Sequence, residues 1–124
     1  MGQARRFRSV ALIVEDDAMQ REMLSLLLEE SGYHVIQCES GEDARHVLDV
    51  AAGTLCFLMT DVQLAGRTDG VELARLAKER NPGLDVVVTS GRPLTQPLPD
   101  GAKFWAKPWA PLDVLREAEI AQLS

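Results

Sequence analysis

Short apolar segments of strand length alternate along this chain with longer segments in which apolar residues recur at helical spacing. The strand-length segments cover residues 9–14, 33–38, 55–60, 86–89 and 102–106. The third segment is apolar throughout, as expected for a strand that is covered on both faces. Regular alternation of strands and helices is typical of a parallel sheet with helices on both faces. The sequence therefore predicts an α/β fold with five parallel strands.

Four segments between and after these strands have the pattern of amphipathic helices. Their starts carry residues suited to a first turn or a cap, such as Ser40, Asp69 and Pro111. Right-handed crossovers leave few strand orders, and we expect the doubly wound, flavodoxin-like order 2-1-3-4-5. The apolar residues expected on the inner helix faces are Met19, Met23, Leu26 and Leu27 in the first helix, Ala44, Val47, Leu48 and Ala51 in the second, Val71, Leu73, Ala74 and Ala77 in the third, and Leu112, Leu115, Ala118 and Leu123 in the last.

The segment between the fourth and fifth strands lacks a helical pattern. Residues 91–101 contain three prolines and two glycines. A proline inside a helix removes a backbone hydrogen bond and clashes with the preceding turn. We therefore expect a loop with at most one helical turn at this place.

Length and charge limit the classes of protein to which the chain can belong. Its 124 residues are enough for one domain and too few for two. A net charge of −6 argues against direct nucleic-acid binding, which needs a basic surface. We interpret Arg5, Arg6 and Arg8 as part of a solvated tail over residues 1–8, followed by one domain over 9–124. No apolar run is long enough for a membrane span or a signal peptide, so we expect a cytoplasmic protein.

Polar side chains follow four of the predicted strands. Glu15 and Asp16 follow the first strand, Asp61 the third, Ser90 the fourth and Lys107 the fifth. Ligands of open parallel sheets bind outside the carboxyl ends of the strands, so we expect these groups to meet there. Clustered carboxylates need a neutralising cation, and Mg²⁺ suits a site with few protein carboxylates. One carboxylate can then attack a phosphoryl group while Mg²⁺, the lysine and the hydroxyl bind its oxygens.

The same positions carry a resemblance to a known family. The matching segments are residues 12–17, 59–64 with Asp69-Gly70, 87–91 and 101–108. In order and spacing they resemble the receiver domain of two-component response regulators, over about residues 9–120. The resemblance implies a signalling switch that catalyses only its own phosphorylation and slow dephosphorylation, rather than a metabolic enzyme. It implies a phosphohistidine donor on a histidine kinase or a histidine phosphotransfer protein, Mg²⁺ as cofactor, and a changed interaction surface for a further protein.

The resemblance also implies a role for each site residue. Asp61 would be the phosphoacceptor, and Lys107 would pair with the phosphoryl group. Ser90 would be the switch hydroxyl and Phe104 the switch aromatic side chain. The Mg²⁺ ligands would be Asp16, Asp61, Glu15 acting through water, and the backbone carbonyl of Gln63. Asp17 competes for the metal role, and we expect it instead in the first turn of the first helix.

Two features depart from the family pattern. The segment between Ser90 and Lys107 is shorter than in common receivers, and its prolines stand where the family has a fourth helix. One extra residue lies within 65–69 and is expected to change only the loop beside the site. Trp109, near strands that the missing helix leaves less covered, either packs at the edge of the core or anchors a partner.

Two other classes of protein share parts of this pattern. A phosphatase of the haloacid-dehalogenase type needs a second aspartate two residues after the nucleophile, where Gln63 stands. A receiver-fold interaction module that works without phosphorylation would have lost Asp61, Lys107 or the acidic pair, and none is lost. Because the fourth helix is missing, an interaction module of this kind is kept as the alternative function. We also leave open homodimer formation and a receiver excised from a hybrid kinase, although the start at Met1 favours a stand-alone regulator.

Overall fold

Five parallel strands form a single sheet in the computed structural model, which describes residues 9–123. The predicted tail at residues 1–8, with its three arginines, lies outside the described residues. The strand order β2-β1-β3-β4-β5 confirms the predicted order, and every neighbouring pair is parallel. The strands are β1 (Ser9–Val14), β2 (Tyr33–Cys38), β3 (Leu55–Asp61), β4 (Asp85–Ser90) and β5 (Lys103–Ala106).

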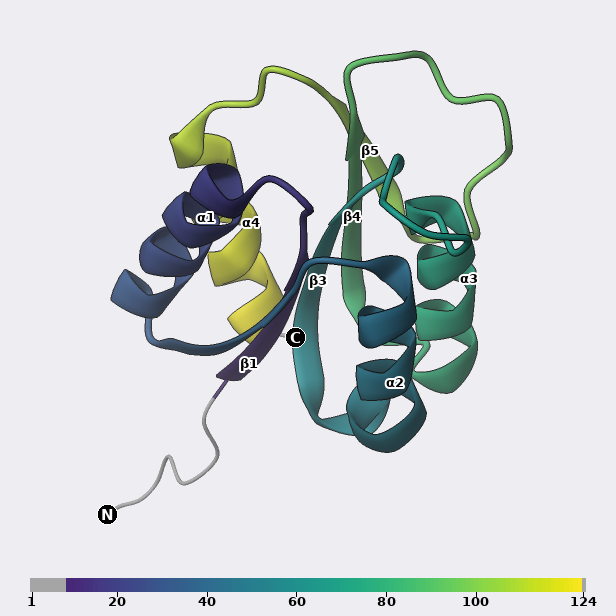
Figure 1. The fold of residues 1–124 in the computed structure, drawn as a ribbon. Helices are drawn as coiled ribbons and strands as arrows, with labels where there is room; N and C mark the ends of the chain where they lie inside the picture. Colours follow the sequence, from purple (N-terminus) through teal and green to yellow (C-terminus); the bar gives the residue numbers. More distant parts are fainter. Residues whose placement is uncertain (1–8, 124) are drawn as a thin grey trace.

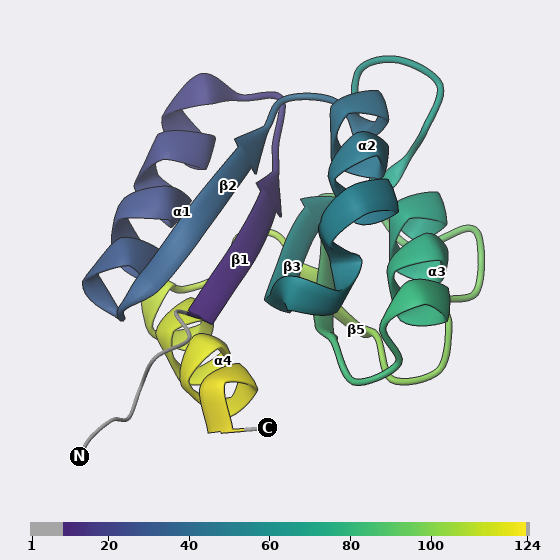
Figure 2. The same cartoon turned by 90° about the horizontal axis from the view of Figure 1, so that it is seen from below.

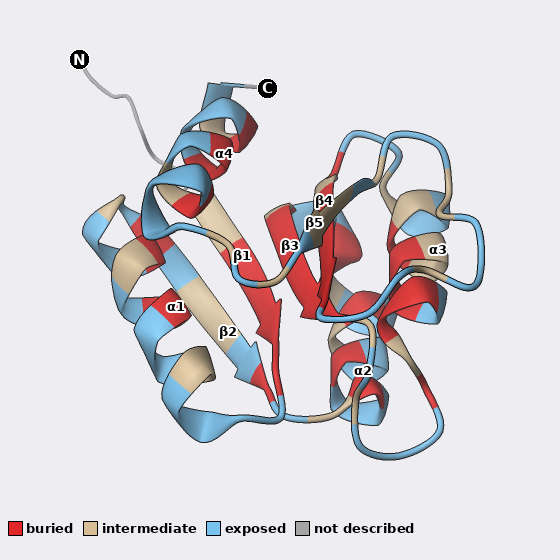
Figure 3. Cartoon of the chain, turned by 90° about the horizontal axis from the view of Figure 1, so that it is seen from above, coloured by how far each residue is buried: buried red, intermediate tan, exposed pale blue. Residues whose placement is uncertain are grey.

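Helices cover both faces of the sheet, as Figures 1 and 2 show. Helices α1 and α4 pack on the face that carries Ile13 and Phe57, while α2 and α3 pack on the face that carries Leu12 and Leu58. Figure 3 shows that the central strands are almost entirely buried between these layers. In the described residues, no helix is long and apolar enough to cross a membrane. The helices are α1 (Ala18–Glu30), α2 (Gly41–Ala51), α3 (Gly70–Arg80) and α4 (Pro111–Leu123), with a short 3₁₀ turn at Ala52–Thr54.

The predicted inner faces are correct for α2 and α3 and wrong for α1. In α1, Met19 is 84% exposed and Leu26 is 54% exposed, whereas Leu24 and Leu28 are buried. The methionine and leucine residues of this helix occur on more than one of its sides, so helical spacing alone is compatible with more than one buried face. Ser25 accompanies the two leucines inward because its hydroxyl donates to the backbone oxygen of Arg21 and is therefore satisfied. Packing against the sheet, rather than periodicity, selects the buried face.

The predicted inner face of α4 is also partly wrong. Ala118 is buried as expected, but Leu112 and Leu123 are 53% and 86% exposed. Val114 and Glu117 are buried instead. A buried glutamate is not expected from an apolar pattern, and it needs a partner that the pattern does not reveal.

That partner belongs to a charged cluster at the amino ends of β4 and β5. Lys103 pairs with Glu117 of α4, and its Nζ lies 3.7 Å from Asp85 Oδ1. The other oxygen of Asp85, Oδ2, is buried and has no hydrogen-bond partner among the described residues. The cluster therefore joins α4 to the end of the sheet that is opposite the ends carrying Ser90 and Lys107.

No helix lies between β4 and β5 in the described residues, where the chain runs as a loop, as its prolines lead one to expect. The loop lies along α3, and the Arg75 guanidinium donates to Gln96 Oε1 at 3.2 Å. Leu98 and Ala102 pack against the core on the α2 and α3 face. The loop thus supplies part of the apolar cover and leads into β5, a strand of only four residues at the edge of the sheet.

Candidate functional site

The carboxyl ends of β1, β3, β4 and β5 meet at one edge of the sheet, as predicted. A pocket lies there, and its lining brings together six of the seven residues predicted for the site. The lining residues are Glu15, Asp16, Asp17, Gln20, Asp61, Gln63, Ser90, Gly91 and Lys107. Phe104 is the predicted residue that does not belong to this pocket.

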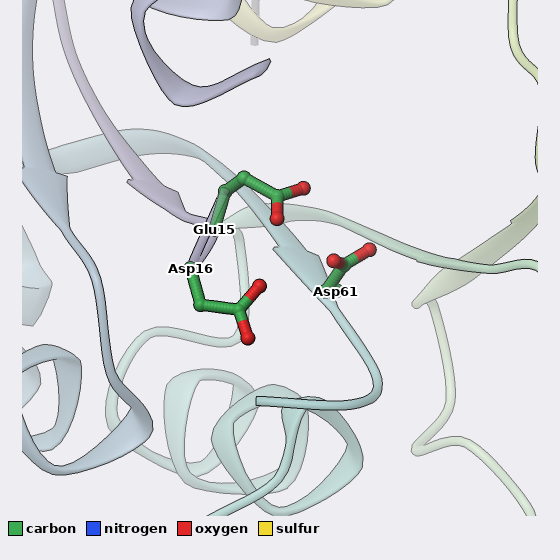
Figure 4. Close-up of side chains that lie close together, drawn as sticks. All are labelled: Glu15, Asp16 and Asp61. Atoms are coloured by element: carbon green, nitrogen blue, oxygen red, sulfur yellow. The ribbon is translucent and has the colours of Figure 1, made fainter. Parts of the chain in front are cut away.

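Three carboxylates converge in the pocket. Glu15 and Asp16 follow β1, Asp61 ends β3, and Figure 4 shows their side chains turned toward a common space. One oxygen from each residue lies within 4.8 Å of the others. These oxygens are hard, negatively charged ligands, and their mutual repulsion is relieved by a divalent cation. The donor set therefore fits Mg²⁺.

Glu15 is the most buried member of this group. It is 4% exposed, and its Oε2 accepts a hydrogen bond from the backbone N–H of Asp17 at 3.0 Å. Burial raises the pKa of Glu15 to about 7, and the neighbouring charge of Asp61 adds to this increase. A second charged carboxylate so close to Asp61 is unfavourable without a cation. Such mutual repulsion is expected of carboxylates that bind a metal ion together.

Asp17 has a different task from Asp16. Its Oδ1 accepts a hydrogen bond from the backbone N–H of Gln20 at 3.0 Å, so it caps α1. The prediction placed Asp17 inside the first turn, but it lies just before the helix because its side chain satisfies a free N–H of that turn. Asp17 is outside the group of three converging carboxylates.

Lys107 connects the carboxylates to β5. Its Nζ lies 2.8 Å from Asp61 Oδ1 and 3.6 Å from Glu15 Oε1. Its backbone N–H donates to the backbone oxygen of Ser90 at 2.9 Å, which fixes the chain after β5 beside the end of β4. Burial alone would lower the pKa of Lys107, but its hydrogen bond to Asp61 and the charges of both carboxylates raise it. The ammonium group therefore stays charged in the pocket.

The remaining predicted residues occupy different surroundings. Ser90 lines the pocket, and its Oγ accepts a hydrogen bond from the backbone N–H of Arg92 at 3.0 Å. Gln63 is exposed at the rim. Phe104 is half-buried in β5 and lines a separate groove with Trp105 and Trp109. Trp109 also packs against the core on the α1 and α4 face, in keeping with the edge-packing interpretation.

The loop after β3, with its extra residue, is held by the start of α2. Glu42 Oε2 accepts hydrogen bonds from the backbone N–H groups of Arg67 and Thr68 at 2.7 and 3.2 Å. At the other end of the loop, Gly70 begins α3 so close to β3 that a Cβ there would lie 1.9 Å from the backbone oxygen of Asp61. The loop is therefore held at both of its ends, and no sequence pattern indicated the contact with Glu42.

Sequence reasoning also assigned no role to Thr89. This residue is 3% exposed, and its Oγ1 donates to Asp61 Oδ1 at 2.9 Å. The available signal was the pair of hydroxyl residues at the end of β4. Successive strand residues point to opposite faces, so only one of the pair can share the side of Asp61 within the sheet.

Comparison with known proteins shows the family of the chain. The family model described as "Response regulator receiver domain" matches residues 11–103. The chain belongs to this family. A curated relative, the response regulator receiver protein CpdR of Brucella abortus, is 34% identical over 113 residues, which are 87% of this chain and 92% of the relative.

Solved receiver structures have the same fold as this receiver domain. A response regulator receiver protein from Sinorhizobium medicae has a TM-score of 0.84 at 21% identity, covering 94% of this chain and 96% of that one. The receiver domain of the hybrid histidine kinase CckA has a TM-score of 0.78 at 27% identity, covering 91% of this chain and 98% of that one. The chain is thus a receiver domain of a two-component system, a class of signalling modules rather than metabolic enzymes.

Proposed function

We propose that this receiver domain is a phosphoacceptor switch that takes a phosphoryl group onto Asp61 with Mg²⁺. The observation that carries the proposal is the environment of Asp61. Its Oδ1 is 2.8 Å from Lys107 Nζ, and two further carboxylates lie close enough to share a cation with it. A nucleophile, a fixed positive charge and an acidic ligand set are the parts that phosphoryl transfer requires.

The donor that fits this chemistry is a phosphohistidine on a histidine kinase or a histidine phosphotransfer protein in the cytoplasm. A carboxylate oxygen of Asp61 forms a bond to phosphorus while the bond from phosphorus to the imidazole nitrogen breaks. The imidazole leaves with the electron pair, and a proton from solvent neutralises it. Lys107 stabilises negative charge on the phosphoryl oxygens because its ammonium group already lies in the pocket.

Four pocket residues would bind Mg²⁺, not all in the same way. Asp16 and Asp61 would bind the ion directly, Glu15 through water, and Gln63 through its backbone carbonyl. The bound ion supplies positive charge that neutralises the phosphoryl oxygens during transfer. Burial raises the pKa of Glu15, and a bound cation would favour its charged form and so oppose this increase.

The phosphorylated state would be read through β4, β5 and the loop between them. Ser90 would turn toward the new phosphoryl oxygens, and Phe104 in β5 would shift with it. Phe104 lies in register with Val88 of β4, two residues before Ser90, so movement at the end of β4 is close to it. The exposed loop and the groove beside Trp109 would then form the changed surface for a protein partner.

Phosphorylation by acetyl phosphate with Mg²⁺ tests the proposal. Intact-mass measurement is expected to show one added phosphoryl group on the wild type and none on Asp61→Asn. Asp69→Asn is the matched control, because asparagine also caps a helix and should leave phosphorylation unchanged. A wild-type protein that gains no mass, and whose fluorescence does not respond to beryllofluoride with Mg²⁺, would contradict the switch and favour the interaction module.

Metal binding is tested separately in the unphosphorylated protein. Asp16→Asn is expected to weaken Mg²⁺ binding strongly, and Asp17→Asn only slightly, because Asp17 is occupied as the cap of α1. Tryptophan fluorescence or calorimetry measures both affinities. The reverse order of the two variants would show that the metal ligands are wrongly assigned.

A further inference from the structure

Thr89 lies beside the proposed phosphoacceptor in the neighbouring strand. Asp61 and Thr89 are partners in the register of β3 and β4, so their side chains leave the same face of the sheet. The hydroxyl of Thr89 donates to Asp61 Oδ1 at 2.9 Å, and both side chains are buried. The backbone oxygen of Thr89 accepts a hydrogen bond from Val62, the residue after Asp61, which holds the two strand ends together.

Two donors therefore meet on one oxygen of the carboxylate. Thr89 Oγ1 and Lys107 Nζ lie 2.9 and 2.8 Å from Oδ1, while no ammonium, backbone N–H or hydroxyl donor among residues 9–123 is placed on Oδ2. The terminal torsion of an aspartate is soft, so a carboxylate without such contacts would turn easily. A threonine side chain is stiff at its first torsion, and its donor is therefore held in place. The pair of donors fixes the plane of the carboxylate and leaves Oδ2 free.

The adjacent hydroxyl does not duplicate this contact. The Oγ of Ser90 instead accepts a hydrogen bond from the backbone N–H of Arg92. The two hydroxyls at the end of β4 therefore have different partners, the loop for Ser90 and the carboxylate for Thr89. Lys107 also differs from Thr89, because it is needed at the phosphoryl oxygens once transfer occurs. Thr89 is the donor that can stay on Oδ1 throughout.

We propose that Thr89 is a positioning residue for phosphoryl transfer, whose hydroxyl holds Asp61 Oδ1 so that Oδ2 is the oxygen that bonds to phosphorus. This inference rests on the proposed function of Asp61. With acetyl phosphate, the bond from Oδ2 to phosphorus forms as the bond from phosphorus to the acetate oxygen breaks, and acetate leaves with the electron pair. Oδ1 becomes the carbonyl oxygen of the acyl phosphate and still accepts the Thr89 hydrogen bond.

Two substitutions separate the hydroxyl of Thr89 from its methyl group. Thr89→Val keeps the shape and removes the donor, whereas Thr89→Ser keeps the donor and removes the methyl. The rate of phosphorylation by acetyl phosphate is expected to fall about tenfold in Thr89→Val, which is near the lower limit for losing a hydrogen bond to a charged group. Thr89→Ser is expected to react within about twofold of the wild type but to unfold at a lower urea concentration than Thr89→Val.

Thr60→Val is the matched control. Thr60 is also buried at the end of β3, and its hydroxyl donates to the backbone oxygen of Asp61 at 2.9 Å rather than to the carboxylate. This variant is expected to lose stability and keep the wild-type rate. In the metal-free protein, the ¹³C shift of the Asp61 carboxyl carbon is expected to move in Thr89→Val and to stay near the wild-type value in Thr89→Ser.

The outcomes distinguish this inference from the proposed function. A wild type that is not phosphorylated overturns the role of Asp61 and, with it, the role of Thr89. A wild type that is phosphorylated, together with a Thr89→Val variant of equal rate, overturns the role of Thr89 alone. Equal slowing of Thr89→Val and Thr89→Ser would also overturn it, because packing rather than the hydroxyl would then control the rate.

Discussion

Replacing Asp85 with asparagine is expected to stabilise the protein at neutral and alkaline pH and to leave its stability near pH 4 unchanged. The side chain of Asp85 is 13% exposed, and its Oδ2 has no hydrogen-bond donor among the described residues. Burial and the adjacent carboxylate of Glu117 raise the pKa of Asp85 to about 7, and Lys103 opposes this only in part. Tyr33 lies near this cluster, but its hydroxyl donates to the backbone of α4.

The direction follows from the protons bound by each state. Unfolded aspartate releases its proton near pH 3.8, whereas Asp85 in the folded protein retains its proton up to about pH 7. The folded state therefore binds more protons in this window, and the free energy of unfolding falls as pH rises through it. The shift corresponds to at most about 4 kcal/mol, at roughly 1.4 kcal/mol for each pKa unit. Burial alone would raise the pKa of Glu117, but its contacts with Asp85 and Lys103 lower it, and a lowered carboxylate pKa stabilises the folded state at neutral pH. This offsets part of the cost of Asp85, so we expect Asp85→Asn to raise the free energy of unfolding by about 2 kcal/mol.

Asparagine mimics the protonated form of Asp85 at every pH. Its amide group can donate to Glu117, and its carbonyl oxygen can accept from Lys103, so both neighbours keep a partner. The matched control is Asp49→Asn, which removes an exposed ion pair with Arg80. Exposed pairs contribute about 0–1 kcal/mol, so this control is expected to change stability little and with no comparable pH dependence.

Urea unfolding followed by circular dichroism from about pH 4 to pH 8 gives the measurement. The difference between Asp85→Asn and the wild type is expected to grow from near zero to about 2 kcal/mol and to level off above about pH 7. Other titrating groups, Glu15 among them, affect both proteins equally and cancel in the difference. A difference that stays constant over this range, or a variant less stable than the wild type at about pH 8, would refute the reasoning.

Three further substitutions test local features of the fold, each by urea unfolding. Gly70→Ala is expected to lose about 3 kcal/mol because its Cβ would lie 1.9 Å from the backbone oxygen of Asp61, whereas Gly53→Ala meets no atom within 4 Å and is expected to be tolerated. Asp69→Ala removes the capping box of α3 and is expected to cost about 1 kcal/mol; no loss would show that the cap is dispensable. Tyr33→Phe removes a buried hydroxyl that donates to the backbone of α4 and is expected to cost about 1 kcal/mol, with an unchanged midpoint arguing against that hydrogen bond.

The sheet and the pocket were predictable because each depends on local sequence signals. Apolar runs define the strands, and the polar residue that follows each run marks its carboxyl end. Parallel strands bring these ends together, so Glu15, Asp61 and Lys107 were expected at one place, where the structure places them. The absence of a helix between β4 and β5 was also predictable, because proline restricts the local backbone and removes a hydrogen-bond donor.

The remaining details depend on contacts between segments that are distant in sequence. Leu24 rather than Leu26 faces the core because the sheet, not the helix period, selects the face of α1. Glu117 is buried because Lys103 from another element pairs with it. Thr89 contacts the Asp61 carboxylate because of the register between β3 and β4, which no local pattern specifies.

The short fifth strand also bears on how copies of the molecule meet at high concentration. An open sheet edge exposes unpaired N–H and C=O groups onto which a strand of another chain can add, a common route to aggregation. Here that edge is only four residues long, begins at Lys103, and is followed by Lys107 and by Pro108, which has no N–H to offer. A foreign strand therefore gains few hydrogen bonds there. The short β5 strand, followed by Pro108, is therefore a poor template for an intermolecular β-sheet.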